Sequence, residues 1–339
     1  MNPQQLSDWL EQYPRIRLAH LPTALEPLDR LSTELGGPRI WFKRDDCTGL
    51  ATGGNKTRKL EYLMADAKAA QATTVVTYGA VQSNHARQTA AACARLGLSC
   101  HLVLSRVVPW RHPDYESNAN VLLDNLLGAS VHRVDFADTP GYAKDLIKTL
   151  GEQDQQPYVI PPGGSNAIGA RGYVRCALEL VEQSPGNLEL TDVAHATSST
   201  GTQAGLLIGF ALADADVRVH GINVSASDRE EIVTNLRGVI HASGETPEIG
   251  EERVHVDHRY IGEGYGLPTP ETLAAIRMVA ELEGIVLDPV YTGKAMSGLI
   301  DRVAIGEFDH ANDVVFIHTG GTATLPVYDT AFAQGPLGK

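Results

Sequence analysis

The stretch Thr52-Gly53-Gly54-Asn55-Lys56-Thr57-Arg58-Lys59 places a lysine where a glycine-containing loop is expected to become a helix. The apolar residues that follow recur at spacings of three and four, as on one face of a helix: Leu60, Leu63, Met64 and Ala67. Counted back along this pattern, Lys56 begins the apolar face, while Lys59 and Asp66 are expected toward its edge. Desolvation lowers the pKa of a lysine, and a neutral amine can form a Schiff base. Taken alone, Lys56 is more simply explained as a side chain that reaches back to water from the first turn.

A second loop has the character of a phosphate site. Ser198, Ser199, Thr200, Gly201 and Thr202 follow an apolar strand and precede an apolar helix, whose first N–H groups are free to bind an anion. The loop is neither a Walker loop nor a G-x-G-x-x-G motif, which disfavours nucleotide binding. An ordinary capped turn is an equally good interpretation of the loop alone. Together with Lys56, however, it indicates the cofactor pyridoxal 5'-phosphate.

Polar residues gather at other predicted strand ends and loops. Gln82-Ser83-Asn84-His85 supplies amides, a hydroxyl and an imidazole, although Asn84 taken alone is most simply the cap of the next helix. Tyr291 lies on a tight loop between two helices, where it could stack on a cofactor or move a proton. Thr319 ends the last strand. The segment Lys43-Arg44-Asp45-Asp46 is interpreted as ion-paired structure rather than as a catalytic carboxylate pair.

Charge and composition exclude several functions. The 339 residues carry a net charge of −13, which argues against nucleic-acid or acidic-membrane partners. There is no basic-then-apolar signal pattern and no apolar run long enough to span a bilayer, so a cytoplasmic location is expected. The four cysteines form no C-x-x-C pair and the histidines form no H-E-x-x-H motif, so no metal site is expected.

The chain alternates β-branched runs with helical segments, which predicts an α/β fold with parallel sheets. The predicted strands are 73–78, 99–104, 130–135, 158–160, 192–197, 218–224 and 314–318. The predicted helices are 57–70, 84–96, 117–127, 141–149, 167–183, 202–213, 228–242, 270–282 and 295–305. A ligand is expected at the carboxyl ends of the strands, between two lobes.

Several motifs in order resemble one family, that of aminocyclopropane-carboxylate deaminase and D-cysteine desulfhydrase. The matching stretches are 53–61, 82–88, 163–166, 288–291 and 318–321, and the similarity extends from about Leu18 to Leu325. The resemblance implies a fold-type-II, tryptophan-synthase-β-like enzyme with two lobes. The large, cofactor-binding lobe would comprise residues 1–56 and 166–339, and the small lobe residues 57–165. A homodimer is expected as well.

The resemblance also implies roles for individual residues. Lys56 would be the Schiff-base lysine, Asn84 the partner of the cofactor's ring hydroxyl, and Thr319 the partner of its pyridine nitrogen. Residues 198–202 would hold the phosphate. The substrate would be bound by Gln82, Ser83, Asn84 and His85, with Ser83 contacting its carboxylate or moving a proton. Tyr291 would stack near the cofactor and act on the substrate, so that Lys56, Ser83 and Tyr291 form the catalytic set.

Three positions favour the desulfhydrase branch over the deaminases. Where the deaminases carry Glu, Gln and Leu, this chain has Thr292, His85 and Thr319. Within the branch, residues 43–50, 195–197 and 263–268 are similar to L-cysteate sulfo-lyases, whereas residues 291–296 are more similar to D-cysteine desulfhydrases. The expected activity is therefore β-elimination from D-cysteine or L-cysteate, giving pyruvate, ammonia and sulfide or sulfite. The alternatives are an aminocyclopropane-carboxylate deaminase, an amino-acid racemase on the same cofactor, and a cofactor-binding protein without catalysis.

Overall fold

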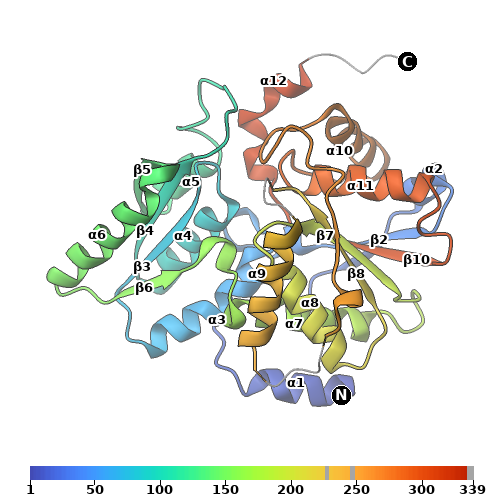
Figure 1. The fold of residues 1–339 in the computed structure, drawn as a ribbon, viewed down its shortest axis with the longest axis horizontal. Coiled ribbons are helices and arrows are strands. Elements are labelled where there is room, and N and C mark those ends of the chain that lie inside the picture. Colours follow the sequence, from blue (N-terminus) through green and yellow to red (C-terminus); the bar gives the residue numbers. More distant parts are fainter. Residues whose placement is uncertain (226–228, 245–248, 334–339) are drawn as a thin grey trace.

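The fold contains two separate sheets, one in each half of the molecule seen in Figure 1. It was obtained as a computed structural model, which describes residues 1–225, 229–244 and 249–333. The larger sheet has the strand order β1-β2-β10-β7-β8-β9, and all its neighbours are parallel except β1 and β2. Its strands are Leu25–Pro27, Arg39–Lys43, Asp313–Ile317, Asp192–Thr197, Arg218–Asn223 and His255–Asp257, in that order.

The smaller sheet is wholly parallel and has the order β5-β4-β3-β6. Its strands are Ser130–Asp135, Ser99–Arg106, Thr74–Ala80 and Pro157–Ile160, in that order. All four lie within the predicted small lobe, and the strands of the larger sheet lie outside it. The division of the chain at residues 56/57 and 165/166 itself stays a prediction.

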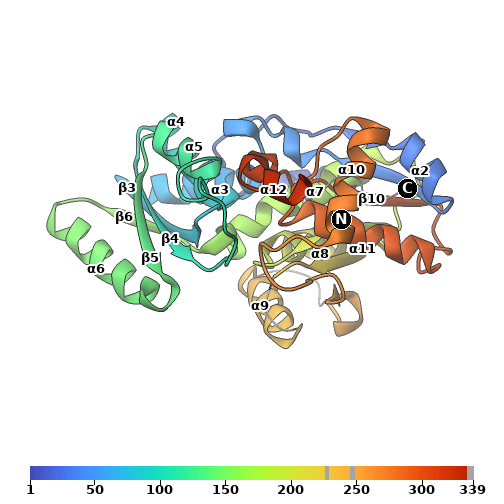
Figure 2. The ribbon, with the colours of Figure 1, turned by 90° about the horizontal axis from the view of Figure 1, so that it is seen from above.

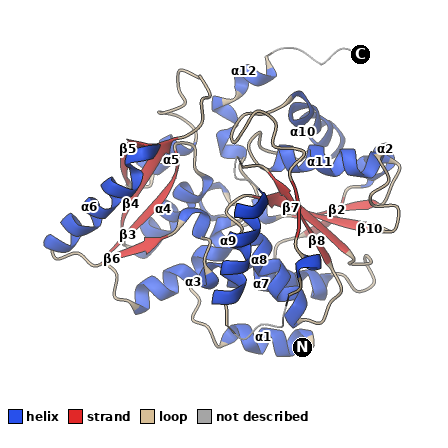
Figure 3. Ribbon diagram, viewed as in Figure 1, coloured by secondary structure: helices blue, strands red, loops and turns tan. Residues whose placement is uncertain are grey.

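Helices cover both faces of each sheet, as Figures 2 and 3 show. Their bounds are Pro3–Glu11 (α1), Asp29–Leu35 (α2), Lys56–Ala69 (α3), Asn84–Leu96 (α4), Asn120–Leu126 (α5), Thr139–Glu152 (α6), Ala167–Gln183 (α7), Gly201–Leu212 (α8), Arg229–Ala242 (α9), Pro270–Glu283 (α10), Thr292–Ala304 (α11) and Asp329–Phe332 (α12). Short 3₁₀ turns fill several connections, among them Leu50–Thr52 before α3.

Strand β10 explains why the larger sheet is covered on both sides. Val314 and Phe316 pack in one core with α2, α10 and α11, whereas Val315 and Ile317 pack in another with α7, α8 and α9. Because successive residues of a strand point to opposite faces, an unbroken apolar run such as 314–317 needs a helix layer on each side. The smaller sheet follows the same rule, with α3 and α4 on one face and α6 on the other.

The predicted α/β class with parallel sheets is correct, and all seven predicted strands are present within a few residues of their predicted ends. Strands β1, β2 and β9 were not predicted, nor were α1, α2 and α12. Of these three strands, β1 and β9 have only three residues each and lie at the edges of the larger sheet, where little periodicity can develop. Residue 228, the predicted start of α9, lies outside the described residues. None of the described helices is long and apolar enough to cross a membrane.

Candidate active site

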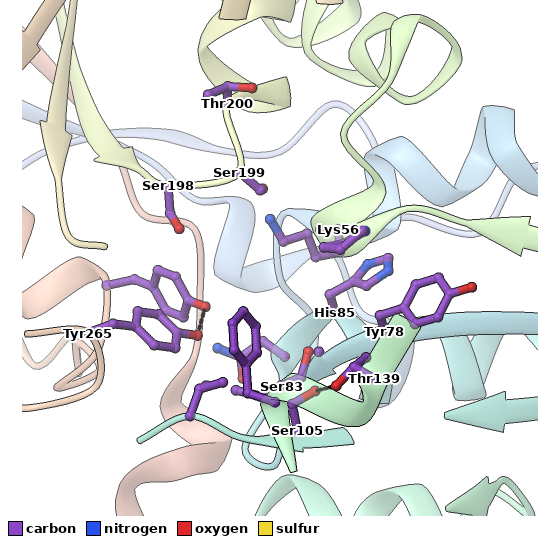
Figure 4. Close-up of a pocket in the computed structure, with 18 of the residues that line it drawn as sticks. Lys56, Tyr78, Ser83, His85, Ser105, Thr139, Ser198, Ser199, Thr200 and Tyr265 are labelled. Carbon is purple, nitrogen blue, oxygen red and sulfur yellow. Dashed lines mark hydrogen bonds between the residues drawn. The ribbon is translucent and has the colours of Figure 1, made fainter. Parts of the chain in front are cut away.

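A cavity of about 670 Å³ opens where β3, β7 and β10 end, beside the first turn of α3. Figure 4 shows Lys56, Ser83 and His85 on one side of it and Ser198, Ser199 and Tyr265 on the other. Most of the predicted site residues line this cavity: Lys56, Ser83, Asn84, His85, Ser198, Ser199, Thr200, Thr202, Tyr291 and Thr319. Carboxyl ends of parallel strands from two sheets thus meet at one cavity, as expected for an α/β enzyme.

The loop before Lys56 is held in an unusual backbone conformation. Ala51 and Thr52 both have positive φ angles, of 41° and 71°, which non-glycine residues rarely adopt. Arg87 of α4 holds them there, because its guanidinium donates to Ala51 O, to the Thr52 hydroxyl and, at 2.9 Å, to Gly53 O. Gln88 then accepts the Thr57 N–H at 2.9 Å and caps the first turn of α3. The two motifs 52–59 and 82–88 therefore form one structural unit.

Lys56 begins α3, as predicted, and its amino group reaches the cavity. Burial lowers the pKa of Lys56 to about 8. Lys59, expected at the edge of the apolar face, is instead fully buried, and this correction matters because the two amines hydrogen bond with each other. Burial and the neighbouring Lys56 together lower the pKa of Lys59 well below its usual value. Two buried ammonium groups repel each other, so the pair favours a neutral amine at Lys59, and burial is what lowers the pKa of Lys56.

Lys59 lies next to the predicted phosphate loop. Its Nζ donates to Gly163 O at 3.1 Å and to Ser165 Oγ at 3.3 Å. Ser165 Oγ in turn accepts the Gly201 N–H at 3.2 Å and donates to Ser199 Oγ at 2.9 Å. Lys59 was not predicted to be a phosphate ligand. Residues three apart on a helix are neighbours, so its spacing from Lys56 could have indicated that it lies near the site.

The turn at 198–202 presents free N–H groups to the cavity. Thr200 has a left-handed backbone with φ of 63°, and α8 starts at the next residue, Gly201. The backbone N–H groups of Ser199, Thr200 and Thr202 have no acceptor among the described residues. Gly201 itself does not line the cavity. Its N–H is hydrogen bonded to Ser199 O and Ser165 Oγ. A helix start with free donors and a nearby lysine amine is a favourable site for a phosphate.

Glycine at residue 163 is required by close packing across the cavity. A Cβ atom at Gly163 would lie 2.3 Å from Ser199 Oγ and 3.4 Å from Lys56 Nζ. Its φ of 65° also favours glycine. The segment 163–166 therefore closes the gap between the lysine and the phosphate loop, as a cradle that a larger side chain would fill.

The segment 82–85 divides between structural and site roles. Ser83, rather than Asn84, caps α4, since its Oγ accepts the Ala86 N–H at 3.1 Å. Gln82 does not line the cavity, and its predicted role in substrate binding is not supported by its position. Its amide is used up by the loop before α5: Nε2 donates to Tyr115 O and Asn118 O, and Oε1 accepts the Asn120 N–H.

The protonation state of His85 follows from its neighbours. The Thr77 hydroxyl donates to Ile160 O at 2.8 Å, so at its 2.8 Å contact with His85 Nε2 it must accept. Nε2 therefore carries the proton, and Nδ1 is a bare acceptor, buried and without a partner among the described residues. Burial, with Lys56 and Lys59 nearby, lowers the pKa of His85 well below its usual value. In this neutral state His85 Nδ1 can accept a hydrogen bond but offers none, so its predicted role in substrate binding, which stays a prediction, would be that of an acceptor.

Tyr291 faces the cavity in contact with a second phenol. The hydroxyls of Tyr291 and Tyr265 are hydrogen bonded, and their rings are 5.8 Å apart in an edge-on arrangement. Burial raises the pKa of both phenols, so both are protonated near neutral pH. Asp288 fixes the position of Tyr291 by accepting its backbone N–H at 2.9 Å. Tyr265 lies in the segment 263–268, which is similar to L-cysteate sulfo-lyases. No local sequence pattern marks it as a site residue.

Thr292 lies behind the cavity wall. Its hydroxyl donates to Asp288 Oδ1 at 2.7 Å and accepts the Asp288 N–H at 2.8 Å, and the side chain is fully buried. Thr319 differs, because it lines the cavity and its carbonyl accepts the Asn55 N–H at 3.0 Å. Of the two threonines that distinguish this chain from the deaminases, only Thr319 is placed to touch a ligand directly.

The acidic groups near the motif 52–59 lie away from the cavity. Asp45 binds Arg58 at 2.8 Å and Asp46 binds Arg44 at 2.7 Å, which confirms the interpretation of residues 43–46 as ion-paired structure. Among the described residues, no cluster of three or more histidine, cysteine or acidic side chains is arranged to hold a metal ion.

Comparison with known families identifies a match over most of the chain. The profile of a family described as pyridoxal-phosphate dependent enzyme matches residues 16–320. Among curated proteins, the D-cysteine desulfhydrase of Klebsiella pneumoniae (strain 342) is 44% identical over 322 residues, which is 94% of this chain and 97% of the relative. The D-cysteine desulfhydrase of Salmonella typhi is 42% identical over 320 residues, with the same coverage of both chains.

Solved structures agree with this match. A crystal structure of an ACC deaminase homologue superposes with a TM-score of 0.87 at 36% identity and covers 98% of both chains. A pyridoxal 5'-phosphate-dependent aspartate racemase superposes with a TM-score of 0.65 over 94% of both chains. At 17% identity, the racemase likeness concerns the fold alone.

Proposed function

The chain belongs to the family of pyridoxal-phosphate dependent enzymes, and on that premise we propose that it is a carbon–sulfur lyase that removes sulfide from D-cysteine. The observation that supports this most is the cavity in which Lys56, the free N–H groups of Ser199, Thr200 and Thr202, and the paired phenols of Tyr265 and Tyr291 meet. Relatives at 42–44% identity over nearly the whole chain carry the same activity in their names.

The described residues fit the cofactor at both of its ends. The start of α8 offers unpaired N–H groups, and Lys59 adds an amine beside Ser165, where the dianionic phosphate would sit. Lys56, with a pKa lowered to about 8, offers an amine that is partly neutral near neutral pH and can attack an aldehyde. Thr319 would face the pyridine nitrogen and Asn84 the ring hydroxyl, both from the cavity wall.

When bound, pyridoxal phosphate supplies an electron sink for the negative charge that develops at the substrate Cα. Lys56 would hold the cofactor's aldehyde carbon and, as a partly neutral amine on the cavity wall, would take the substrate Cα proton at Nζ. Its buried surroundings suit this role, since they hold its pKa near the operating pH. A hydroxyl at Thr319, unlike a carboxylate, need not keep the ring nitrogen protonated, which favours prompt loss of the β-substituent.

The phenol pair would serve the leaving group. Both tyrosines are neutral, so the pair holds one hydroxyl proton in their shared hydrogen bond and one that can be donated to the sulfur as the Cβ–S bond breaks. Ser83 would orient the substrate carboxylate from the start of α4, where the helix terminus also favours negative charge. Loss of sulfide leaves aminoacrylate, which water converts to pyruvate and ammonia.

A second substrate, L-cysteate, is retained because Tyr265 comes from the segment that is similar to sulfo-lyases and forms part of the cavity wall. With L-cysteate the leaving group would be sulfite instead of sulfide. The ring substrate aminocyclopropane-carboxylate is less well supported, since Thr319 stands where the deaminases carry leucine. Racemization on the same cofactor stays an alternative, which measurement of pyruvate separates from β-elimination. The expected cytoplasmic homodimer stays a prediction, which light scattering and cell fractionation would test.

A substrate panel tests the proposal directly. The purified holoenzyme is incubated with D-cysteine, L-cysteine, L-cysteate and aminocyclopropane-carboxylate, and keto acid, sulfide, sulfite and substrate enantiomers are measured. We expect pyruvate and sulfide in equal amounts from D-cysteine and little 2-oxobutanoate from the ring substrate. Sulfite from L-cysteate with no sulfide from D-cysteine would assign the sulfo-lyase activity instead. Enantiomer exchange without keto acid would identify a racemase, and no turnover of any substrate would favour a binding protein.

A further inference from the structure

The amide of Asn84 is held from behind by a second buried amide. Asn120, the first residue of α5, donates from Nδ2 to Asn84 Oδ1 at 3.0 Å, while its own Oδ1 is buried without a partner among the described residues, so this hydrogen bond is the one contact of its amide. Asn120 is fully buried, and Asn84 is 8% exposed, on the cavity side. With its oxygen occupied, Asn84 can present only Nδ2, a donor, to the cavity, and this nitrogen has no acceptor among the described residues.

The chain enters α5 in a strained conformation that brings Asn120 to this position. Ala119 has φ of 57° and ψ of −126°, a conformation that a residue with a Cβ rarely adopts. Gln82 holds the turn in place, because its amide accepts the Asn120 N–H at 3.0 Å and donates to Asn118 O at 3.1 Å. Backbone strain of this kind persists where the surroundings enforce it, often next to a functional site.

We propose that Asn120 is a positioning residue that fixes the Asn84 amide with its N–H groups toward the cavity and thereby stabilises the deprotonated ring oxygen of the cofactor. The inference rests on the proposed function only in taking pyridoxal phosphate as the ligand of this cavity. A donor that hydrogen bonds to the charged form of a group lowers its pKa. If the Asn84 amide were reversed, its oxygen would face the ring oxygen and raise that pKa instead.

Replacing Asn120 by aspartate turns the hydrogen-bond donor that faces Asn84 into an acceptor, at almost unchanged side-chain size. The carboxylate of Asn120→Asp accepts hydrogen bonds but donates none, so the Asn84 amide is expected to turn and to present its oxygen to the cavity. The readout is the absorption spectrum of the bound cofactor, titrated with pH in the absence of substrate. We expect the pH midpoint of the spectral change to rise by about one unit or more, which corresponds to one hydrogen bond to a charged oxygen.

Two further variants separate amide orientation from other effects. Asn120→Leu removes the hydrogen bond to Asn84 Oδ1 without adding a charge, so the Asn84 amide is free to turn. A smaller rise of the pH midpoint is therefore expected. In an Asn84→Ala background, Asn120→Asp should shift the midpoint no further, whereas a direct effect of the new carboxylate would persist. Asn125→Asp, on the exposed face of the same helix, is the matched control and should leave the spectrum unchanged.

Other ionizable groups near the two amides are retained in every variant and therefore cancel in this comparison. They lie on the cavity side and one helical turn further along α4 and α5: Lys56, Lys59, His85, Arg87 and Asp124. Burial raises the pKa of Asp124 to about 7, so the titration is compared with that of the wild-type holoenzyme over the same pH range.

The results distinguish the inference from the proposed function. If the wild-type protein binds the cofactor and releases pyruvate from D-cysteine, but neither Asn120→Asp nor Asn120→Leu shifts the midpoint, Asn120 does not orient Asn84. A further shift by Asn120→Asp in the Asn84→Ala background would equally overturn the role. If the wild-type protein shows no cofactor absorbance at all, the proposed function fails first.

Discussion

Helix α3 begins with buried cations whose surroundings differ sharply. Arg58 binds Asp45 and Glu179 with both of its edges, at 2.8–2.9 Å, and also contacts the Thr23 hydroxyl. Lys56 and Lys59, on neighbouring positions of the same helix, have no carboxylate among the groups that shift their pKa values. Arg58 faces α7 and the 45–47 turn, whereas Lys56 lines the cavity and Lys59 contacts Gly163 and Ser165 behind it.

The difference teaches how to distinguish structural from functional charge in this fold. A buried cation that is matched by carboxylates contributes to a fixed arrangement, and removing one partner leaves the others unpaired. Burying a lysine without a counter-charge costs free energy in the unliganded protein. The same lysine stabilises the complex when an anion or an aldehyde binds beside it. The unpaired lysines therefore mark the ligand site, and the paired arginine marks the scaffold that holds it.

The largest expected effect is the loss of activity when Lys56 is replaced. Lys56→Ala should lower kcat on the order of 10⁴-fold or more, the scale seen when a covalent catalytic group is removed. Borohydride reduction of the wild-type holoenzyme, followed by peptide mapping, should find the cofactor on Lys56. Lys68→Ala, at an exposed position of the same helix, should keep full activity. Labelling of another lysine would contradict the assignment.

Replacing Arg58 should affect stability most. Arg58→Ala leaves Asp45 and Glu179 buried without their partner, and the free energy of unfolding is expected to fall by roughly 3–5 kcal/mol. Urea denaturation of the cofactor-free protein measures the change, and Lys68→Ala again serves as the control. By contrast, Lys56→Ala should not destabilise the cofactor-free protein, because it removes an amine that no carboxylate compensates. A loss of stability as large as that of Arg58→Ala would erase the distinction between the two regions.

Lys59 should affect cofactor affinity and not the stability of the cofactor-free protein. Lys59→Met removes one donor to the expected phosphate, so the dissociation constant for pyridoxal phosphate should rise about 10- to 100-fold, the value of one charged hydrogen bond. Fluorescence titration of the cofactor-free protein measures this constant. An unchanged constant would mean that Lys59 does not bind the phosphate, and that it acts only on the pKa of Lys56 through their hydrogen bond.

The smallest expected effect is the pH dependence of cofactor uptake. In the cofactor-free protein the pKa of Lys56 is lowered to about 8, so the amine gains its reactive neutral form as pH rises through that value. The rate of binding, followed by absorbance after mixing, should rise about tenfold per pH unit below pH 8 and level off above it. In Lys59→Met, loss of the amine whose hydrogen bond raises the pKa of Lys56 should move this midpoint downward, because burial then acts on Lys56 alone. A midpoint near 10.5 in the wild-type protein would show that Lys56 is not desolvated.

Much of the site could be predicted from local sequence because its residues directly precede or begin regular elements. Lys56 starts an apolar helical face, and residues 198–202 join an apolar strand to an apolar helix. Such positions combine a visible periodicity with free backbone groups, so both the element and its terminus can be predicted. The helices Asn84–Leu96 and Ala167–Gln183 have their predicted bounds for the same reason.

Other features depend on partners far away in the chain. Gln82 was expected in the substrate site, but the backbone at 115–120 engages its amide, and no local pattern reveals that contact. The tautomer of His85 depends on Thr77 and Ile160, and the pairing of Tyr265 with Tyr291 spans two loops. The position of Lys59 was wrongly predicted because the segment that buries it, 163–165, lies a hundred residues further on.

The sequence by itself therefore determined the α/β class, the lysine, the phosphate turn and the strand ends that carry polar groups, since each follows from periodicity and from the unpaired N–H groups at a helix start. Only the tertiary structure decided which buried cations are paired and which are not. Arg58 and Lys59 are adjacent in the chain and equally buried, yet they project from α3 toward different neighbours, the carboxylates of Asp45 and Glu179 on one side and the neutral oxygens of Gly163 and Ser165 on the other. Because the free energy of a buried charge depends on the groups within a few ångströms, it is fixed by packing between distant segments and not by local pattern.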